Sequence, residues 1–295
     1  MKAIKLASVF AVTAVAVAVS STTFAAEAVF SGEAGVEYVN YSNSKVAGAN
    51  NTNNNSADGT NLGEVELSVD TGVVYAEIEV ATTGVDEATT IGLEKLYVKQ
   101  GAVSFGRFDG SVSTGSFFGM NEIYGGVDLN TTSDTDNTGV RYKVTPELTV
   151  ALEATRSTAT EDSDVGVALS YVQDFGGFKA GISGGSVGDA NSVNVGVQSV
   201  AGPATLSLNY GVGEKGTGTT TDVEQMTASV AVAATDALTL TLEYSKDLET
   251  AGEPDGTYFI GEYAVGDLTY YVKNYAGDLV GDADERTIVG VKAFF

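Results

Sequence analysis

The sequence predicts an all-β protein: an antiparallel up-and-down β-barrel of sixteen strands that spans a membrane. Three observations predict this fold. Apolar and polar residues alternate in short runs along nearly the whole chain, tight turns and longer polar loops alternate between those runs, and the chain ends in Phe295. Alternation alone would also suit a soluble sandwich, because any sheet with one apolar face shows a period of two residues. The regular order of the connections favours the barrel.

The amino terminus predicts export. Two lysines precede an Ala- and Val-rich run, Leu6–Val19, and small residues then lead to a cleavage site after Ala25. This is the pattern of a secretory signal peptide. The alternative is a membrane anchor, but about 14 apolar residues are too few to cross a ~30 Å hydrocarbon core as a helix. We therefore expect residues 1–25 to be removed and residues 26–295 to form one domain.

The composition excludes several classes of function. The chain has 39 acidic and 15 basic residues, and it contains neither Cys nor His. Loss of two lysines with the signal peptide takes the net charge from −24 to about −26. Such acidity repels phosphates, so nucleic acid is not an expected partner. Without imidazole or thiolate, Ser-His-Asp, Cys-His and His-zinc chemistry are impossible. We expect no enzymatic activity and no cofactor.

Sixteen runs with period-two alternation are predicted as strands. In one of them, Leu148, Val150 and Leu152 share one face, while Thr149 and Glu153 lie on the other. The predicted strands cover residues 28–40, 63–70, 73–81, 91–99, 102–109, 137–145, 147–156, 164–174, 177–185, 192–200, 204–212, 223–233, 237–246, 256–264, 267–275 and 285–295.

The connections fall into two alternating sets. The tight set is Asp70–Gly72, Gln100–Gly101, Thr145–Pro146, Asp174–Gly176, Ala201–Pro203, Ala234–Asp236 and Val265–Gly266. The longer, polar set is 41–62, 82–90, 110–136, 157–163, 186–191, 213–222, 247–255 and 276–284. Strict alternation is typical of an up-and-down barrel with tight turns at its periplasmic rim and loops outside.

The polar faces of the strands suit water. The strand predicted over 204–212 carries small uncharged residues on that face: Thr205, Ser207, Asn209 and Gly211. Sixteen strands enclose more space than side chains can fill, so we expect an aqueous channel.

Glycine is frequent, and two reasons compete for it. Gly176–Gly177 suits a turn, whereas Gly181 and Gly184–Gly185 suit close contact between strands.

Five segments occur in a specific order. Val103–Asp109 carries a Phe-Gly-Arg run, and Asp136–Tyr142, which ends in an Arg-Tyr pair, follows after a long connection. Within that connection, Asn121–Asp128 is acidic and contains two adjacent glycines. Pro146–Leu148 comes next, and the chain ends in Val291–Phe295. This order and spacing resemble the general trimeric porins of Gram-negative outer membranes.

The resemblance implies that the third external loop folds into the lumen and narrows it. It also implies a homotrimer in outer-membrane lipid and lipopolysaccharide, with a terminal strand whose Phe295 is recognised by the barrel-assembly machinery. The chain departs from better-known members in its small loops and few arginines, so a full ladder of lumen arginines is not expected.

We expect charges of opposite sign to face each other across the narrowest part of the lumen and to set up a transverse field. The candidates are Glu122 and Asp128 on the loop, and Arg107 and Arg141, with Lys99 and Lys143 as lesser candidates, on the wall. Arg107 shares strand parity with apolar neighbours, which leaves its facing open. The alternative is that these charges are solvated at the rim or form ion pairs that tie the loop to the wall.

Four glutamates on one predicted hairpin are expected to line the lumen and to favour cations: Glu64, Glu66, Glu77 and Glu79. A paired acid/base site is the alternative, but no nucleophile accompanies them.

Asp134 and Asp136 with Asn137 have the oxygen-ligand spacing of a calcium loop. The closing Glu of such a loop is absent, so solvated turn residues are favoured and no metal is expected.

The sequence thus predicts a porin in the outer membrane of a Gram-negative bacterium, with passive diffusion of small hydrophilic solutes and ions and a preference for cations. One alternative is a substrate-selective channel, for example for an oligosaccharide, with Tyr75, Tyr258 and Tyr271 as sliding contacts. Another is a surface adhesin or structural barrel without a pore.

Overall fold

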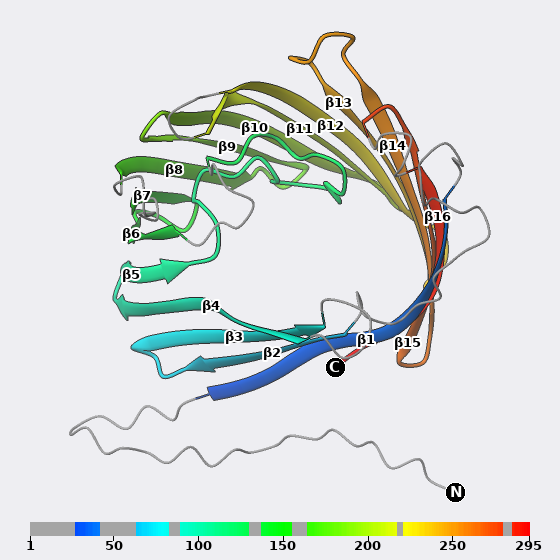
Figure 1. Ribbon diagram of the computed structural model, residues 1–295, viewed down its shortest axis with the longest axis horizontal. Coiled ribbons are helices and arrows are strands. Elements are labelled where there is room, and N and C mark those ends of the chain that lie inside the picture. Colours follow the sequence, from blue (N-terminus) through cyan, green and yellow to red (C-terminus); the bar gives the residue numbers. More distant parts are fainter. Residues whose placement is uncertain are drawn as a thin grey trace, which may run out of the picture.

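A computed structural model shows a closed barrel of sixteen antiparallel strands, as the sequence predicts (Figure 1). It describes residues 27–41, 63–82, 89–129, 137–154, 164–216, 221–279 and 285–295. The predicted signal peptide and the Asp134 and Asp136 pair lie outside the described residues. No described helix has the length and apolar character needed to cross a membrane.

Each predicted strand overlaps one strand of the structure. The largest difference is at the end of β11, which runs to Lys215 because the period-two pairing with β12 continues to Thr221. The strands are β1 (Glu27–Tyr41), β2 (Gly63–Asp70), β3 (Val74–Thr82), β4 (Thr89–Gln100), β5 (Val103–Phe108), β6 (Asn137–Lys143), β7 (Leu148–Ala154), β8 (Val165–Asp174), β9 (Phe178–Val187), β10 (Ala190–Ala201), β11 (Ala204–Lys215), β12 (Thr221–Ala233), β13 (Leu238–Asp247), β14 (Asp255–Val265), β15 (Leu268–Gly277) and β16 (Arg286–Phe294).

The barrel closes where the first strand pairs with the last. Every strand pairs with its neighbour in the chain, and β1 pairs with β16. Gly32 and Phe295 exchange two backbone hydrogen bonds of 3.1 Å, one in each direction. Closure leaves no strand edge, which is the condition for a sheet to stand in hydrocarbon, where no water can satisfy backbone groups.

The outer face of the barrel is apolar. On β10, Val193, Val195 and Val197 are 54%, 45% and 44% exposed, while Ser192 and Asn194, at the alternate positions, are buried on the inner face. The neighbouring strands match this arrangement, because Val195 pairs in register with Ile182 and Tyr210. Apolar side chains exposed outward and polar side chains buried inward are the arrangement of a barrel that stands in lipid.

Three tight turns share one local device. Thr71, Thr145 and Thr235 each stand at the start of a turn, and each Oγ1 accepts hydrogen bonds from the backbone N–H groups two and three residues later, at 2.8–3.3 Å. A threonine hydroxyl in this position satisfies turn donors that the strand ladder leaves unpaired.

One predicted connection is wrong. Residues 186–191 were expected to form a longer polar loop, but β9 and β10 continue to Val187 and Ala190, so only Gly188 and Asp189 join them. Gly188 has a φ of 57°, which a residue without Cβ adopts without strain. The polar residues of this segment therefore form a tight hairpin and not a long loop. Long and short connections do not alternate strictly along the chain.

A charge on the outer face should destabilise the barrel. Val195 lies near the middle of β10 and faces outward, so V195R would place a guanidinium near the bilayer midplane, at a cost of about 2–4 kcal/mol. Urea titration of the barrel folded in vesicles measures this loss. Q198R, on the inner face of the same strand, is the matched control and should cost much less. Equal losses in the two variants would contradict this assignment of faces.

Candidate functional site

Two parts of the inner face of the barrel differ in charge, and β14–β16 carry further charged residues on that face: Glu262, Lys273, Arg286 and Lys292. On β10–β12 it carries neutral polar side chains: Ser192, Asn194, Gln198, Ser207, Asn209, Gln225, Thr227 and Ser229. On β1–β6 the inner face carries charges: Glu33, Glu66, Asp70, Glu77, Glu79, Lys95, Lys99, Arg141 and Lys143. The segment 109–129, which follows β5, contacts the neutral region (Figure 1).

Two asparagines of the neutral region hold this segment through its backbone. Asn194 accepts a hydrogen bond from Val127 N at 2.7 Å and donates one to Val127 O at 2.8 Å. Asn209 does the same for Phe118, at 3.3 Å to its N and 2.5 Å to its O. Each side-chain amide thus pairs with the N–H and the C=O of one residue, as a residue of a neighbouring antiparallel strand would.

Glycines beside the asparagines make room for the loop. A Cβ on Gly211 would lie 2.4 Å from Val127 N, and a Cβ on Gly196 would lie 2.8 Å from Phe117 Cβ. On β9, a Cβ on Gly181 would lie 2.6 Å from the Phe117 ring. Gly181 therefore makes room for the loop ring of Phe117, whereas close contact between strands was expected there. Gly176, with a φ of 82° and open space around it, serves the turn.

The sequence contains a pattern that indicates this loop site and that the predictions above did not use. Asn194-Val-Gly196 on β10 and Asn209-Tyr-Gly211 on β11 repeat one Asn-x-Gly pattern. The register places each asparagine opposite the glycine of the other strand. The polar face of β11 therefore binds the loop. Its composition alone had suggested that these residues line the water-filled lumen.

Two buried glutamates fix the root and the tip of the loop. Glu153 on β7 accepts hydrogen bonds from Ser111 Oγ at 2.6 Å and Val112 N at 2.7 Å. Glu243 on β13, fully buried, accepts from Glu122 N at 3.1 Å and Ile123 N at 3.0 Å. A buried carboxylate is costly unless it is hydrogen-bonded, so these contacts determine where the loop can lie.

Apolar contacts support the loop at two places, where it meets the barrel wall and at its tip. Val112 and Leu129 pack with Ala151, Ala168 and Val187 on the inner face of β7–β9. At the tip, Ile123 packs against a buried cluster on β14–β16: Tyr258, Ile260, Tyr271, Tyr275 and Ile288. Close by, the Thr227 hydroxyl donates to Tyr124 O. Burial, together with the charge of Asp247, raises the pKa of Tyr124, so its hydroxyl stays protonated.

The predicted loop acids and the predicted wall bases bind different partners. Glu122 accepts a hydrogen bond from the Tyr275 hydroxyl on β15. Asp128 accepts one from Gly115 N at 2.8 Å, inside the loop itself. Arg141 lies on β6, in another part of the ring of strands, where its guanidinium stacks 4.1 Å from the Phe108 ring centroid and donates to Gly110 O at 2.5 Å.

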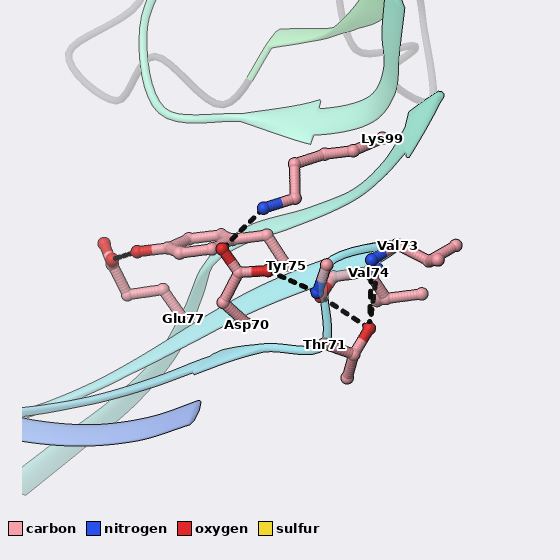
Figure 2. A network of polar contacts seen from close by, with 8 residues as sticks. Asp70, Thr71, Val73, Val74, Tyr75, Glu77 and Lys99 are labelled. Atoms are coloured by element: carbon pink, nitrogen blue, oxygen red, sulfur yellow. Dashed lines mark hydrogen bonds and ion pairs between the residues drawn. The ribbon is translucent and has the colours of Figure 1, made fainter. Parts of the chain in front are cut away.

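The other predicted bases lie at three different places. Lys99 forms an ion pair with Asp70 at 2.5 Å beside the β2–β3 turn, where Asp70 also accepts from Gly72 N (Figure 2). Lys143 lines one cavity with Arg141. Arg107 pairs in register with Leu96 and Thr138, on the face that it shares with outward-facing Phe105.

The predicted acidic hairpin lies on the charged region. Glu66 accepts a hydrogen bond from Ser31 Oγ at 3.2 Å. Glu77 accepts from the Tyr75 hydroxyl (Figure 2) and binds Lys95 at 2.5 Å. Glu79 lies half-buried on the same face, opposite Glu66, and Glu64 pairs with Ala81 in the β2–β3 ladder. The described residues contain no cluster of three potential metal ligands.

Aromatic rings cross the inner face of β3–β5. Tyr75 stacks on Tyr97 with centroids 5.1 Å apart, and Tyr97 stacks on Phe108 at 4.9 Å. The rings turn their faces toward one another. Tyr258 and Tyr271, the other predicted sliding contacts, are 0% and 3% exposed. Tyr258 and Tyr271 therefore offer no open ring faces on which sugars could stack.

The chain can be compared with known proteins by its sequence and by its structure. No protein-family model matches this chain, and no curated protein matches it. Among solved structures, the outer membrane channel DcaP of Acinetobacter baumannii matches with a TM-score of 0.61 and 15% identity over 94% of this chain and 99% of that one. A mutant porin of Rh. blastica matches with 0.61 and 15% over 91% and 100%. OmpT of Vibrio cholerae, in a trimer form, matches with 0.58 and 14% over 92% and 99%.

The chain has the porin fold. The matches extend over nearly the full length of each structure, so the whole barrel is shared and not a single hairpin. At these identities the likeness establishes the fold. The porin fold agrees with the resemblance seen in the Phe-Gly-Arg, loop and carboxyl-terminal segments.

Removing the Glu243 carboxylate should release the loop tip. E243A would leave two loop N–H groups without acceptors, which costs about 1–3 kcal/mol for each buried group. Hydrogen exchange of the amides at 115–129 in the detergent-folded barrel should become faster. The control is E66A on the charged region, which touches β1 and not the loop. Unchanged exchange in E243A would contradict the role of Glu243 as the anchor of the loop tip.

Proposed function

We propose that this chain is an outer-membrane porin of a Gram-negative bacterium. After export and removal of residues 1–25, it forms a water-filled channel for passive diffusion of small hydrophilic solutes and ions. One observation carries the proposal: hydrogen bonds to Asn194, Asn209 and Glu243 hold the loop segment against β10–β13, while the charged inner faces of β2 and β3 have no such contact with it among the described residues. If the interior of the barrel served only to stabilise the fold, charged side chains without a covering loop would not be needed on its inner wall.

The third loop narrows the lumen in this proposal. Its support is the series of hydrogen bonds to inner-face side chains of β7, β10, β11 and β13. Glu122 and Asp128 on the loop would face Arg141 and Lys143 across the remaining water. The separate positions of the acids and bases suit a transverse field, because groups in direct contact would form ion pairs instead.

The channel would prefer cations. The chain carries a net charge of −24, and Glu66, Glu77 and Glu79 lie on the charged region of the inner wall. A negative pore raises the local concentration of cations and lowers that of anions. Partners would be outer-membrane lipid, lipopolysaccharide, the barrel-assembly machinery and two further copies of the chain.

Selectivity is measured from reversal potentials in a planar bilayer under a salt gradient. We expect stepwise conductance with a cation preference, three steps for a trimer, and a preference that falls toward unity in E66Q/E79Q because two lumen charges are lost. D236N, in the exposed β12–β13 turn, controls for the change in total charge. Anion selectivity in the unmodified protein would contradict the proposal. Saturating uptake in liposome swelling with a sugar series would indicate a substrate-selective channel instead.

The role of Phe295 in assembly can be separated from its role in closure. Deleting Phe295 removes the two backbone hydrogen bonds to Gly32, worth about 0.5–1.5 kcal/mol each, whereas F295A keeps them. We expect F295A to refold in detergent nearly as stably as the unmodified chain and yet to accumulate poorly in outer membranes. Cell fractionation and urea unfolding measure the two effects. Normal accumulation of F295A would show that the ring is not the assembly signal.

A further inference from the structure

A narrow apolar groove lies on the outer face of the barrel, beside the tight turns at 175–177 and 202–203. Its volume is about 330 Å³. The outward side chains that line it are Phe178, Val197, Ser199, Leu206 and Leu208. The groove therefore faces the membrane and not the lumen.

The register of three strands produces this groove. Ser199 on β10 pairs with Phe178 on β9 and with Leu206 on β11, so one small side chain lies between two large, exposed ones. Ala201, at the end of β10, pairs with Ala204. These two small side chains leave the groove open toward the turns.

The groove begins at one interface of the membrane. At its entrance, Phe178 stacks on Phe175 with ring centroids 4.8 Å apart, and aromatic rings at strand ends are typical of the membrane–water boundary. From Ala201 to Val197, β10 advances about 13 Å into the hydrocarbon region. Tight turns are typical of the periplasmic rim, so the groove lies in the periplasmic leaflet.

The floor of the groove is apolar although a serine forms part of it. The Ser199 hydroxyl donates to Gly177 O at 3.4 Å and is turned toward the β8–β9 turn. Gln198 and Ser207 also border the groove, but their side chains bond each other at 3.1 Å on the inner face. The groove therefore suits hydrocarbon and not a polar headgroup.

The shape of the groove favours a narrow and flexible occupant. A second copy of the chain would bring a sheet face that rests on Phe178, Leu206 and Leu208 and leaves the floor at Ser199 empty. Empty space between packed apolar surfaces forfeits van der Waals contact. A single acyl chain can bend into the groove and reach its floor, and acyl chains surround the outer face of a barrel in a bilayer.

We propose that this groove binds one acyl chain of a phospholipid in the periplasmic leaflet of the outer membrane. The inference goes beyond the passage of solutes and rests on the membrane location in the proposed function. Lipid tails are as apolar as the groove, so the fit of their shape selects the chain and not the hydrophobic effect. A straight chain follows the floor along β10, whereas methyl branches on a chain collide with Phe178 and Leu206.

The absence of Trp from the chain allows a direct test. F178W places one indole on the wall of the groove, and Y263W places one on the outer face of β14, away from it. Each mature protein is folded in phosphatidylcholine vesicles in which a lipid with bromines in the upper part of its chains quenches the indole. Unlabelled dioleoyl phosphatidylcholine should relieve quenching in F178W about fourfold more effectively than methyl-branched diphytanoyl phosphatidylcholine, the effect of a few van der Waals contacts. The two lipids should act equally in Y263W.

Filling the floor should abolish this preference. F178W/S199L places a larger apolar side chain between the two walls and should bring the ratio to one, whereas F178W/S199A keeps a small floor and should keep the ratio. The comparison of F178W with Y263W remains decisive if S199L does not fold.

Two results would overturn the acyl-chain site. One is an equal ratio at F178W and Y263W, which would indicate ordinary lipid contact. The other is quenching at Y263W without quenching at F178W, which would indicate that a second copy of the chain covers the groove. Because the measurement uses no current, a conducting barrel without the preference would keep the porin function, and a preference in a barrel that does not conduct would keep the site alone.

Discussion

The structure depends on the requirement that every backbone donor and acceptor in the wall has a partner within the chain. Hydrocarbon provides no hydrogen bonds, so a strand edge in the membrane would leave a row of unsatisfied groups. The pairing of β1 with β16, completed by Gly32 and Phe295, removes the only two edges that a sheet of neighbouring strands would otherwise have. Once the wall is closed, each strand must turn one face to lipid and one to the interior, and the alternation of the whole sequence follows from that.

The same requirement shapes the interior. A loop laid against the inner wall brings backbone N–H and C=O groups that must be satisfied there, and amides and hydroxyls satisfy them without the cost of burying charge. Asn194 and Asn209 act as substitute peptide units for Val127 and Phe118, and glycines opposite them allow the close approach. Where charged groups are used, at Glu153 and Glu243, each carboxylate receives loop N–H groups.

Neutral residues of β10–β12, together with Glu153 and Glu243, hold the loop, and of the charged side chains on β1–β6 Arg141 and Lys95 contact its first residues. Within the charged region, the stack of Tyr75, Tyr97 and Phe108 crosses three strands and ends at Arg141. This stack gives the long, flexible side chain of Arg141 a defined position.

The sequence by itself determined the barrel, because lipid on one side and water on the other impose a period of two that survives in single strands. It also indicated the third loop and the bases Arg141 and Lys143 on the inner face. It could not determine which polar residues face water and which bind the loop, since Asn209 has the same pattern in both cases. It missed Glu153 and Glu243 because their partners, Val112 and Ile123, lie on the loop, and no local pattern states where a loop docks. It also missed Lys95, whose partner Glu77 lies opposite it on the neighbouring strand. It also assigned a long loop to 186–191, where continued strand pairing and a positive φ at Gly188 give a hairpin. Only the tertiary structure decided these contacts, because they join residues that the chain separates and the closed wall brings together.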